Sequence, residues 1–194
     1  MVKTNKAFLH LCELKPFSME FNRRFLDKAR STIEYAKSMD PSRDVKDIID
    51  VTIPAIMAEY YIAEYMDGTV NEGEENLEDP MTYGFDVLSG AKYNGARIEV
   101  KCSFSGKWIN VCGGVYGGTK GINLGTFLTH QIADLIIILS VSKKSKGAYK
   151  FTPRVISDHE AFIPEHNFVL KSKYNDSYYL NTKNYPKDCT LKVC

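Results

Sequence analysis

The feature that most constrains the fold is an almost uninterrupted apolar run at residues 134–141 (DLIIILSV). A strand with one face in water alternates apolar and polar residues, whereas a run of this kind is typical of a central strand covered on both faces. Covering both faces requires a further layer on each side of the sheet. The run therefore predicts an α/β protein with a central mixed β-sheet flanked by helices.

The segments around this run supply the other elements. Apolar residues recur at three- and four-residue steps from Phe17 to Ala36, which predicts a helix. A second helical stretch is expected from about Asp44 to Met66, with Pro54 ending or kinking one segment and opening another. The remaining pattern predicts an acidic loop at 69–80, strands at 83–88, 96–104, 108–112 and 148–156, a glycine-rich loop at 113–121 and a helix at 123–132.

The length of 194 residues suits a single domain. We expect extra N-terminal helices in residues 1–50, a core in residues 55–156 and further strands and loops in residues 157–194. No apolar run approaches the roughly 20 residues that span a bilayer, and the first residues lack the features of a signal peptide, so a cytoplasmic protein without a membrane partner is expected. The five cysteines show no Cys-x-x-Cys spacing, which argues against a structural zinc site.

The formal net charge of +1 conceals a strong asymmetry along the chain. Residues 59–91 contain nine acids and no lysine or arginine, whereas residues 92–154 contain ten lysines and arginines and only two acids. Such a division is a weak indication of a polyanionic partner near the second half. A solvated surface with an acidic loop explains it equally well.

Two charged side chains share one face of the strand predicted at 96–104. Glu99 and Lys101 are two positions apart, so they project on the same side about 7 Å from each other. Asp86 lies thirteen positions before Glu99, and a hairpin centred midway between the two acids sets them opposite each other, roughly 5 Å apart. Two carboxylates at that separation repel unless a cation lies between them, and Mg²⁺ prefers such oxygen ligands.

Lys101 adds a positive charge to this pair. A bound Mg²⁺ polarises a phosphate and lowers the pKa of a coordinated water, while a lysine can contact the phosphate or orient the attacking water. Taken alone, however, Glu-x-Lys in a strand is more often a solvated charged face, and that alternative stays open. Glu59 favours the site, because it lies on a predicted helix whose apolar residues would pack on the sheet: Ile56, Tyr60 and Ala63.

In order and spacing, Glu59, Asp86 and Glu99-Val100-Lys101 resemble the PD-(D/E)XK nuclease superfamily. The resemblance implies a restriction-endonuclease-like core in which Asp86 and Glu99 hold the metal ion. It further implies that the carbonyl of Val100 is an additional metal ligand. Lys101 takes the role of the catalytic lysine, and Glu59 that of an accessory carboxylate.

The resemblance covers residues 55–141. The sequence departs from the superfamily pattern at Phe85, which stands where a proline usually precedes the aspartate. The accessory carboxylate is also open at this point, because Glu64 lies on a helical turn close to Glu59.

The resemblance implies a Mg²⁺-dependent endonuclease, with Mn²⁺ as a substitute, that hydrolyses double-stranded DNA. A type II restriction enzyme is the favoured subtype, cutting at a specific sequence as a homodimer, with a possible DNA methyltransferase as its partner. The alternatives are a junction-resolving or phage-type nuclease, a catalytically inactive DNA-binding module of the same fold, and an α/β domain with an accidental match.

Polar residues that follow the Glu-x-Lys strand are candidates for DNA contacts, together with the glycine-rich loop. Lysines can hold phosphates, and asparagines can read the edges of bases. These candidates are Lys107, Asn110, Lys120 and Asn123.

Overall fold

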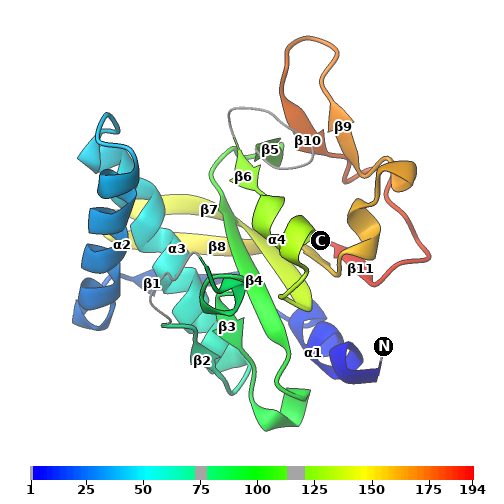
Figure 1. The fold of residues 1–194 in the computed structure, drawn as a ribbon, viewed down its shortest axis with the longest axis horizontal. Helices are drawn as coiled ribbons and strands as arrows, with labels where there is room; N and C mark the ends of the chain where they lie inside the picture. Colours follow the sequence, from blue (N-terminus) through cyan, green and yellow to red (C-terminus); the bar gives the residue numbers. More distant parts are fainter. Residues whose placement is uncertain (1, 73–77, 113–120) are drawn as a thin grey trace.

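A seven-stranded mixed sheet forms the centre of the molecule (Figure 1). The computed structural model describes residues 2–72, 78–112 and 121–194. Within them, β4 and β7 pair in parallel at the centre of the sheet, and the other paired strands of this sheet run antiparallel. The order is β2-β3-β4-β7-β8-β1, with β11 also paired to β8. The strands are β1 (Phe17–Glu20), β2 (Thr69–Val70), β3 (Val87–Leu88), β4 (Arg97–Ser103), β7 (Leu135–Ser145), β8 (Ala148–Ser157) and β11 (Leu191–Val193).

Helices and a second sheet complete the fold, and the α/β prediction with a central mixed sheet is confirmed. The second sheet has the order β6-β5-β10-β9 and contains β5 (Asn110–Cys112), β6 (Ile122–Asn123), β9 (Val169–Lys171) and β10 (Tyr178–Leu180). The α-helices are α1 (Val2–Cys12), α2 (Leu26–Met39), α3 (Val45–Tyr65) and α4 (Gly125–His130). In the described ranges no helix is both long and apolar enough to cross a membrane.

Strand β7 lies between two hydrophobic cores, as its apolar run predicts. Ile137 packs in a core that also contains Ile56 and Met57 of α3, whereas Ile136 packs in a second core with Phe127 of α4. All three isoleucines, the methionine and the phenylalanine are almost completely buried. Helix α3 therefore covers one face of the sheet and α4 the other, which is why both faces of β7 are apolar.

The N-terminal fifty residues contain helices, as expected, but the helix predicted to begin at Phe17 begins only at Leu26, so that part of the prediction is wrong. Phe17–Glu20 forms the edge strand β1, which pairs with β8. The side chain of Phe17 stacks on Tyr61 and on Phe151, with ring centroids 3.6 and 4.9 Å apart. This tertiary packing outweighs a local pattern that a helix would also satisfy, because the strand is stabilised by partners distant in sequence.

Helix α3 continues through Pro54, where the sequence predicts that one segment ends or kinks and another opens. A proline inside a helix costs about 3 kcal/mol or more, but the helix buries apolar side chains on both sides of it, and this packing offsets the cost. The helix ends at the predicted place: Asp67 has a φ of 48°, and Gly68 donates to the carbonyl of Ala63 at 2.8 Å. A Cβ at Gly68 would lie 2.1 Å from the carbonyl oxygen of Leu88, so the close approach requires glycine.

The strand predicted at 83–88 is shorter than expected. Only Val87–Leu88 is paired as β3, while Pro80–Thr82 forms a 3-10 turn. Most of the glycine-rich loop predicted at 113–121 lies outside the described residues.

Candidate active site

Asp86 lies next to Glu99 at the end of the β3–β4 ladder. Val87 pairs with Ile98 and Leu88 with Arg97, which is the register that the thirteen-residue spacing predicts. Just before Val87 the backbone leaves the regular ladder. The Asp86 N–H still donates to the Ile98 carbonyl at 3.0 Å, and its side-chain Oδ2 accepts a hydrogen bond from the backbone N–H of Val100 at 2.7 Å. The Asp86 carboxylate thus accepts the hydrogen bond from Val100 N–H that a backbone carbonyl of a neighbouring strand would otherwise accept.

Glu99 is buried, with only 2% of its surface exposed. Its Oε1 forms an ion pair with Lys101 Nζ, and its Oε2 has no hydrogen-bond partner among the described residues. In the register of the sheet, Glu99 and Lys101 lie beside Ile136 and Ile138. The alternative of a solvated charged strand face therefore does not describe Glu99.

Arg97 has a structural role on the same strand. Its guanidinium binds both carboxylate oxygens of Asp134, with Nε–Oδ2 and Nη2–Oδ1 distances of 3.2 and 3.1 Å, and its backbone N–H donates to Oδ2 at 2.8 Å. A bidentate pair of this kind fixes the start of β4 relative to Asp134, which directly precedes β7. Arg97 is consequently occupied at the start of the strand, and Lys101 is the cation that pairs with Glu99.

Glu59 reaches the same region from α3. It is 9% exposed, and its Oε2 lies 2.9 Å from Nζ of Lys28 on α2. Glu64, by contrast, is exposed and pairs with Arg24 at the molecular surface. The structure therefore brings Glu59 towards Asp86 and leaves Glu64 outside.

The electrostatics confirm that these groups affect one another. Burial, followed by the charge of Asp86, raises the pKa of Glu59 and of Glu99 to about 7. Burial alone would lower the pKa of Lys101, but the neighbouring charges of Glu99 and then Asp86 raise it above its usual range. A site in which carboxylates hold protons near neutral pH is one in which a bound cation would be stabilised.

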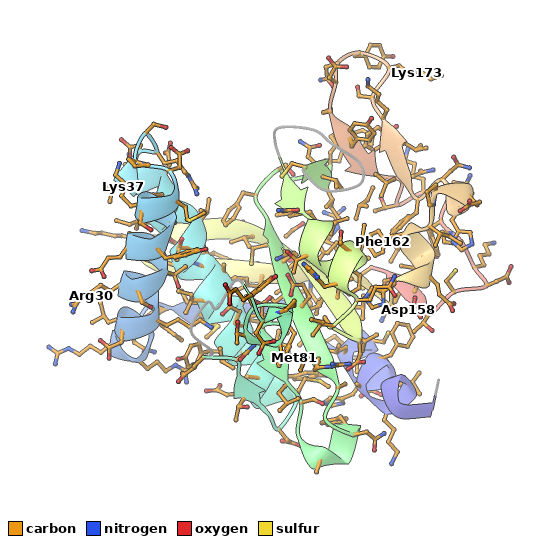
Figure 2. All side chains as sticks on the ribbon, in the orientation of Figure 1. Arg30, Lys37, Met81, Asp158, Phe162 and Lys173 are labelled. Carbon is orange, nitrogen blue, oxygen red and sulfur yellow. The ribbon has the colours of Figure 1, made fainter. Side chains whose placement is uncertain are left out.

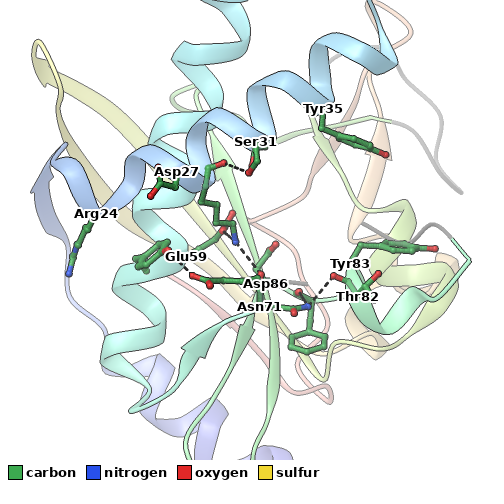
Figure 3. Close-up of a pocket in the computed structure, with 14 residues that line it drawn as sticks. Arg24, Asp27, Ser31, Tyr35, Glu59, Asn71, Thr82, Tyr83 and Asp86 are labelled. Atoms are coloured by element: carbon green, nitrogen blue, oxygen red, sulfur yellow. Dashed lines mark hydrogen bonds and ion pairs between the residues drawn. The ribbon is translucent and has the colours of Figure 1, made fainter. Parts of the chain in front are cut away.

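A cleft of about 900 Å³ is lined by Asp86 and Glu59, whereas Glu99 and Lys101 are not among its lining residues (Figure 3). Asp27 and Ser31 of α2 line one side, and Glu59, Asn71 and Asp86 lie on the other. Among the residues that the structure describes, four carboxylates and two basic side chains line the cleft: Asp27, Glu59, Glu72 and Asp86 against Arg24 and Lys28. An acidic lining of this kind attracts cations and would repel a bare phosphate.

The donor set fits a hard divalent cation. Asp86 and Glu99 offer carboxylate oxygens, and Oε2 of Glu99 is a buried acceptor without a hydrogen-bond donor among the described residues. No group of three or more His, Cys, Asp and Glu side chains in the described residues is arranged as a complete metal site. That is compatible with Mg²⁺, which is commonly held by one or two carboxylates together with waters and substrate phosphates.

Comparison with known proteins gives a family. A model of the family described as bacteriophage T4 endonuclease IV matches residues 1–182. The protein named endonuclease IV from Enterobacteria phage T4 is 36% identical over 185 residues, covering 92% of this chain and 98% of its own length. The chain belongs to the bacteriophage T4 endonuclease IV family. No solved structure matches.

Membership of the endonuclease IV family confirms the coarse prediction of a nuclease. The matched range contains every proposed catalytic and metal-binding residue. The PD-(D/E)XK assignment, the restriction-endonuclease-like core, the division into parts, the metal ion and the specific roles of the residues are untested by these matches and stay predictions.

The candidates for DNA contacts lie apart from the group of acids. Lys107 is exposed, with its Nζ 5.6 Å from the ring centroid of Trp108, and Asn110 belongs to β5 in the second sheet. The side-chain oxygen of Asn123 accepts from the backbone N–H of Gly125 at 2.8 Å, which stabilises the start of α4. Lys120 lies outside the described residues.

Sequence reasoning missed two residues at the site. Lys28 pairs with Glu59, and Asn71 bonds to the segment that carries Asp86. Neither residue stands in a motif, and both act across elements that are distant in sequence, so no sequence signal identifies them.

Proposed function

We propose that this chain is a phage-type DNA endonuclease that hydrolyses phosphodiester bonds with Mg²⁺, or with Mn²⁺ in its place. The observation that carries the proposal is the buried carboxylate of Glu99, next to Asp86 and paired with Lys101, with one oxygen free of hydrogen bonds among the described residues. Membership of an endonuclease family supports it from a separate direction.

Each residue has a role in this proposal. Asp86 and Glu99 would hold the ion, with the Val100 carbonyl as a further ligand, and Glu59 would act as an accessory carboxylate. The bound ion would polarise the scissile phosphate and lower the pKa of a water molecule. Lys101 contacts the phosphate or orients the attacking water, and its charge stabilises the more negative transition state.

The substrate is proposed to be double-stranded DNA. The family favours the phage-type alternative over a type II restriction enzyme, for which a homodimer and a methyltransferase partner are the associated expectations. A catalytically inactive module is disfavoured, because Asp86, Glu99 and Lys101 are all present and adjacent. Mapping the ends of the fragments separates the remaining cases: uniform ends indicate a sequence-specific enzyme, and ends confined to branch points indicate a junction-resolving enzyme.

Cleavage assays test the proposal. Supercoiled, branched and single-stranded DNA are incubated with the protein in Mg²⁺, in Mn²⁺ and in EDTA. We expect Asp86→Ala and Lys101→Ala to lower the cleavage rate at least about a thousandfold, which corresponds to roughly 4 kcal/mol of transition-state stabilisation, while DNA binding persists.

The matched controls remove the same residue types from an exposed ion pair. Asp50 and Lys143 lie 3.5 Å apart at the surface, and Asp50→Ala and Lys143→Ala should cleave within twofold of the wild-type rate, taking about twofold as the resolution of the assay. The proposal fails if the wild-type protein cuts none of these DNAs with either ion, or if Asp86→Ala cleaves like Asp50→Ala.

A further inference from the structure

The chain segment that presents Asp86 is held by one side chain from outside the β3–β4 hairpin. The amide nitrogen Nδ2 of Asn71 donates to the carbonyls of Phe85 and Thr82, at 3.0 and 3.3 Å, and lies 3.5 Å from that of Met81. The backbone N–H of Asn71 donates to the carbonyl of Asp86 at 2.8 Å. A single residue therefore contacts four backbone carbonyls of the segment from Met81 to Asp86 that leads to the carboxylate.

Asp86 is held on its other side by β4. Its backbone N–H donates to the Ile98 carbonyl, and its Oδ2 accepts from Val100. The position of the carboxylate therefore depends on two anchors, and β3 itself, with only two paired residues, contributes little length of ladder. Asn71 binds the residues before Asp86, which β4 does not hold in the contacts described above.

Asn71 is also linked, through Lys28, to Glu59, another acidic residue of the cleft. The backbone carbonyl oxygen of Asn71 accepts a hydrogen bond from Lys28 Nζ at 3.2 Å, and the same ammonium group lies 2.9 Å from Oε2 of Glu59. Figure 3 shows Asn71, Glu59 and Asp86 converging on one side of the cleft. The contacts thus connect α2, α3 and the segment before β3.

The segment has little room to settle elsewhere. Gly84 donates its N–H to the carbonyl of Pro80 at 2.7 Å, and a Cβ on Gly84 would lie 2.6 Å from that oxygen and 3.0 Å from Cβ of Ile132. Because the backbone at Gly84 is packed this closely, loss of the amide bonds would be taken up by a shift of the backbone at Phe85 and Asp86.

We infer that Asn71 is a positioning residue that sets the Asp86 carboxylate for metal binding. The inference rests on the proposed function, in which Asp86 is a metal ligand. Residues that orient a ligand are worth 10- to 100-fold in metal affinity or activity in known metal sites, since a ligand must be held within roughly 0.5 Å of its productive place. Asn71 suits this role because a side-chain amide carries two N–H donors and no charge, so it can bind more than one carbonyl at once.

The test measures metal binding in the absence of DNA. Titration calorimetry with Mn²⁺ alone is carried out on the wild-type protein, on Asp86→Ala and on Asn71→Leu, which keeps the branched shape of the side chain but has no donor. We expect Asn71→Leu to raise the Mn²⁺ dissociation constant about 10- to 100-fold. DNA affinity in EDTA should remain within twofold of wild type, taking about twofold as the resolution of the assay, which a general loss of structure would not allow.

Two further variants make the test decisive. Asn175→Ala removes an amide that accepts two hydrogen bonds from Ser177 in the turn between β9 and β10, and it should bind Mn²⁺ as the wild type does. If Asn71→Leu does not fold, as judged by circular dichroism, Asn71→Ser replaces it. A hydroxyl donates to a single carbonyl, so this variant should show an intermediate loss of affinity.

The outcomes separate the inference from the proposal beneath it. If Asp86→Ala binds Mn²⁺ like the wild type, Asp86 is not a ligand and the proposed function fails. If Asp86→Ala loses binding while the folded Asn71 variant keeps the wild-type dissociation constant, the proposed function stands and the role of Asn71 is overturned.

Discussion

The carboxylate of Asp86 accepts a hydrogen bond from the backbone N–H of Val100, at 2.7 Å, where the β3–β4 ladder ends. One oxygen of the acid is thus used to hold the acid in place, and Val100 is held in the same way. The other oxygen takes no part in this bond. Fixing a carboxylate through one of its oxygens removes conformational freedom that metal binding would otherwise have to remove.

Because of this hydrogen bond, the effect of the Asp86 charge can be measured separately from the effect of holding the side chain in place. Asp86→Asn keeps an oxygen that can accept from Val100, whereas Asp86→Ala removes the acceptor. We expect both variants to lose cleavage. The free energy of unfolding of Asp86→Ala should be about 1 to 2 kcal/mol lower than that of Asp86→Asn. Urea denaturation of the metal-free proteins measures the difference. Equal stabilities would mean that the bond to Val100 contributes nothing.

The buried Glu99 makes stability depend on pH. Its pKa is about 7 in the folded protein, against 4.5 for an ordinary glutamate, so the folded state binds more protons between these values. Stability of the metal-free protein should therefore fall as pH rises from 4.5 through 7, and the whole penalty is present above pH 7.

Glu99→Gln removes this penalty. At pH 8 the variant should be more stable than wild type by roughly 3 kcal/mol, or about 6 to 12 °C in unfolding midpoint, and at pH 4 the two should be alike. Glu64→Gln is the control, because Glu64 is exposed. A Glu99→Gln protein that melts below wild type at pH 8 would show that the ion pair with Lys101 outweighs the cost of burying the charge.

Glu59 and Glu64 provide a matched pair on one helix. We expect Glu59→Gln to lower the cleavage rate about 10- to 100-fold at fixed Mg²⁺, because Glu59 is buried near Asp86. Glu64→Gln should cleave at nearly the wild-type rate, since an exposed pair such as that with Arg24 contributes about 0 to 1 kcal/mol. Plasmid nicking rates decide between them, and equal effects would contradict an accessory role for Glu59.

Lys107 is a proposed phosphate contact and not a proposed catalytic residue. Lys107→Ala should weaken DNA binding about fivefold at 0.1 M salt and reduce the slope of log affinity against log salt by about 1. Lys46→Ala, an exposed lysine at the start of α3, is the control. Binding isotherms at several salt concentrations give the slope, and an unchanged slope would remove Lys107 from the DNA-binding surface.

Asn123 is expected to act on stability instead of on DNA binding. Its side-chain oxygen accepts from the N–H of Gly125 at the start of α4. Asn123→Ala should therefore lower the free energy of unfolding by about 1 kcal/mol. Its affinity for DNA should match that of the wild type, and a selective loss of DNA affinity at unchanged stability would instead support a direct contact.

The sequence was most informative where local periodicity and tertiary structure agree. The spacing of Asp86 and Glu99 predicts the register of β3 and β4 because, in a hairpin, one cross-strand pair determines all the others. The apolar run at 134–141 predicts a strand with two covered faces, which β7 has. Glu59 could be placed because the helical repeat turns its neighbours towards the sheet.

Other features could not be predicted because their cause lies far along the chain. The phenylalanine spacing around Phe17 fits a helix, yet its strand is stabilised by Phe151 and Tyr61. The second sheet is built from strands of two or three residues, which are too short to display a period. Lys28 and Asn71 depend on how three elements meet, and no local pattern encodes that.

The pairing of β1 with β8 has a consequence for how the chain is made. Residue Phe17 finds its partner only when Phe151 has been synthesised, so the edge of the sheet cannot close while the protein is still emerging from the ribosome. Contacts between such distant parts of a chain slow folding, because the long intervening loop must be ordered first. Until then Phe17–Glu20 is an unpaired strand with an apolar side chain, and it exposes the nascent protein to association with other chains.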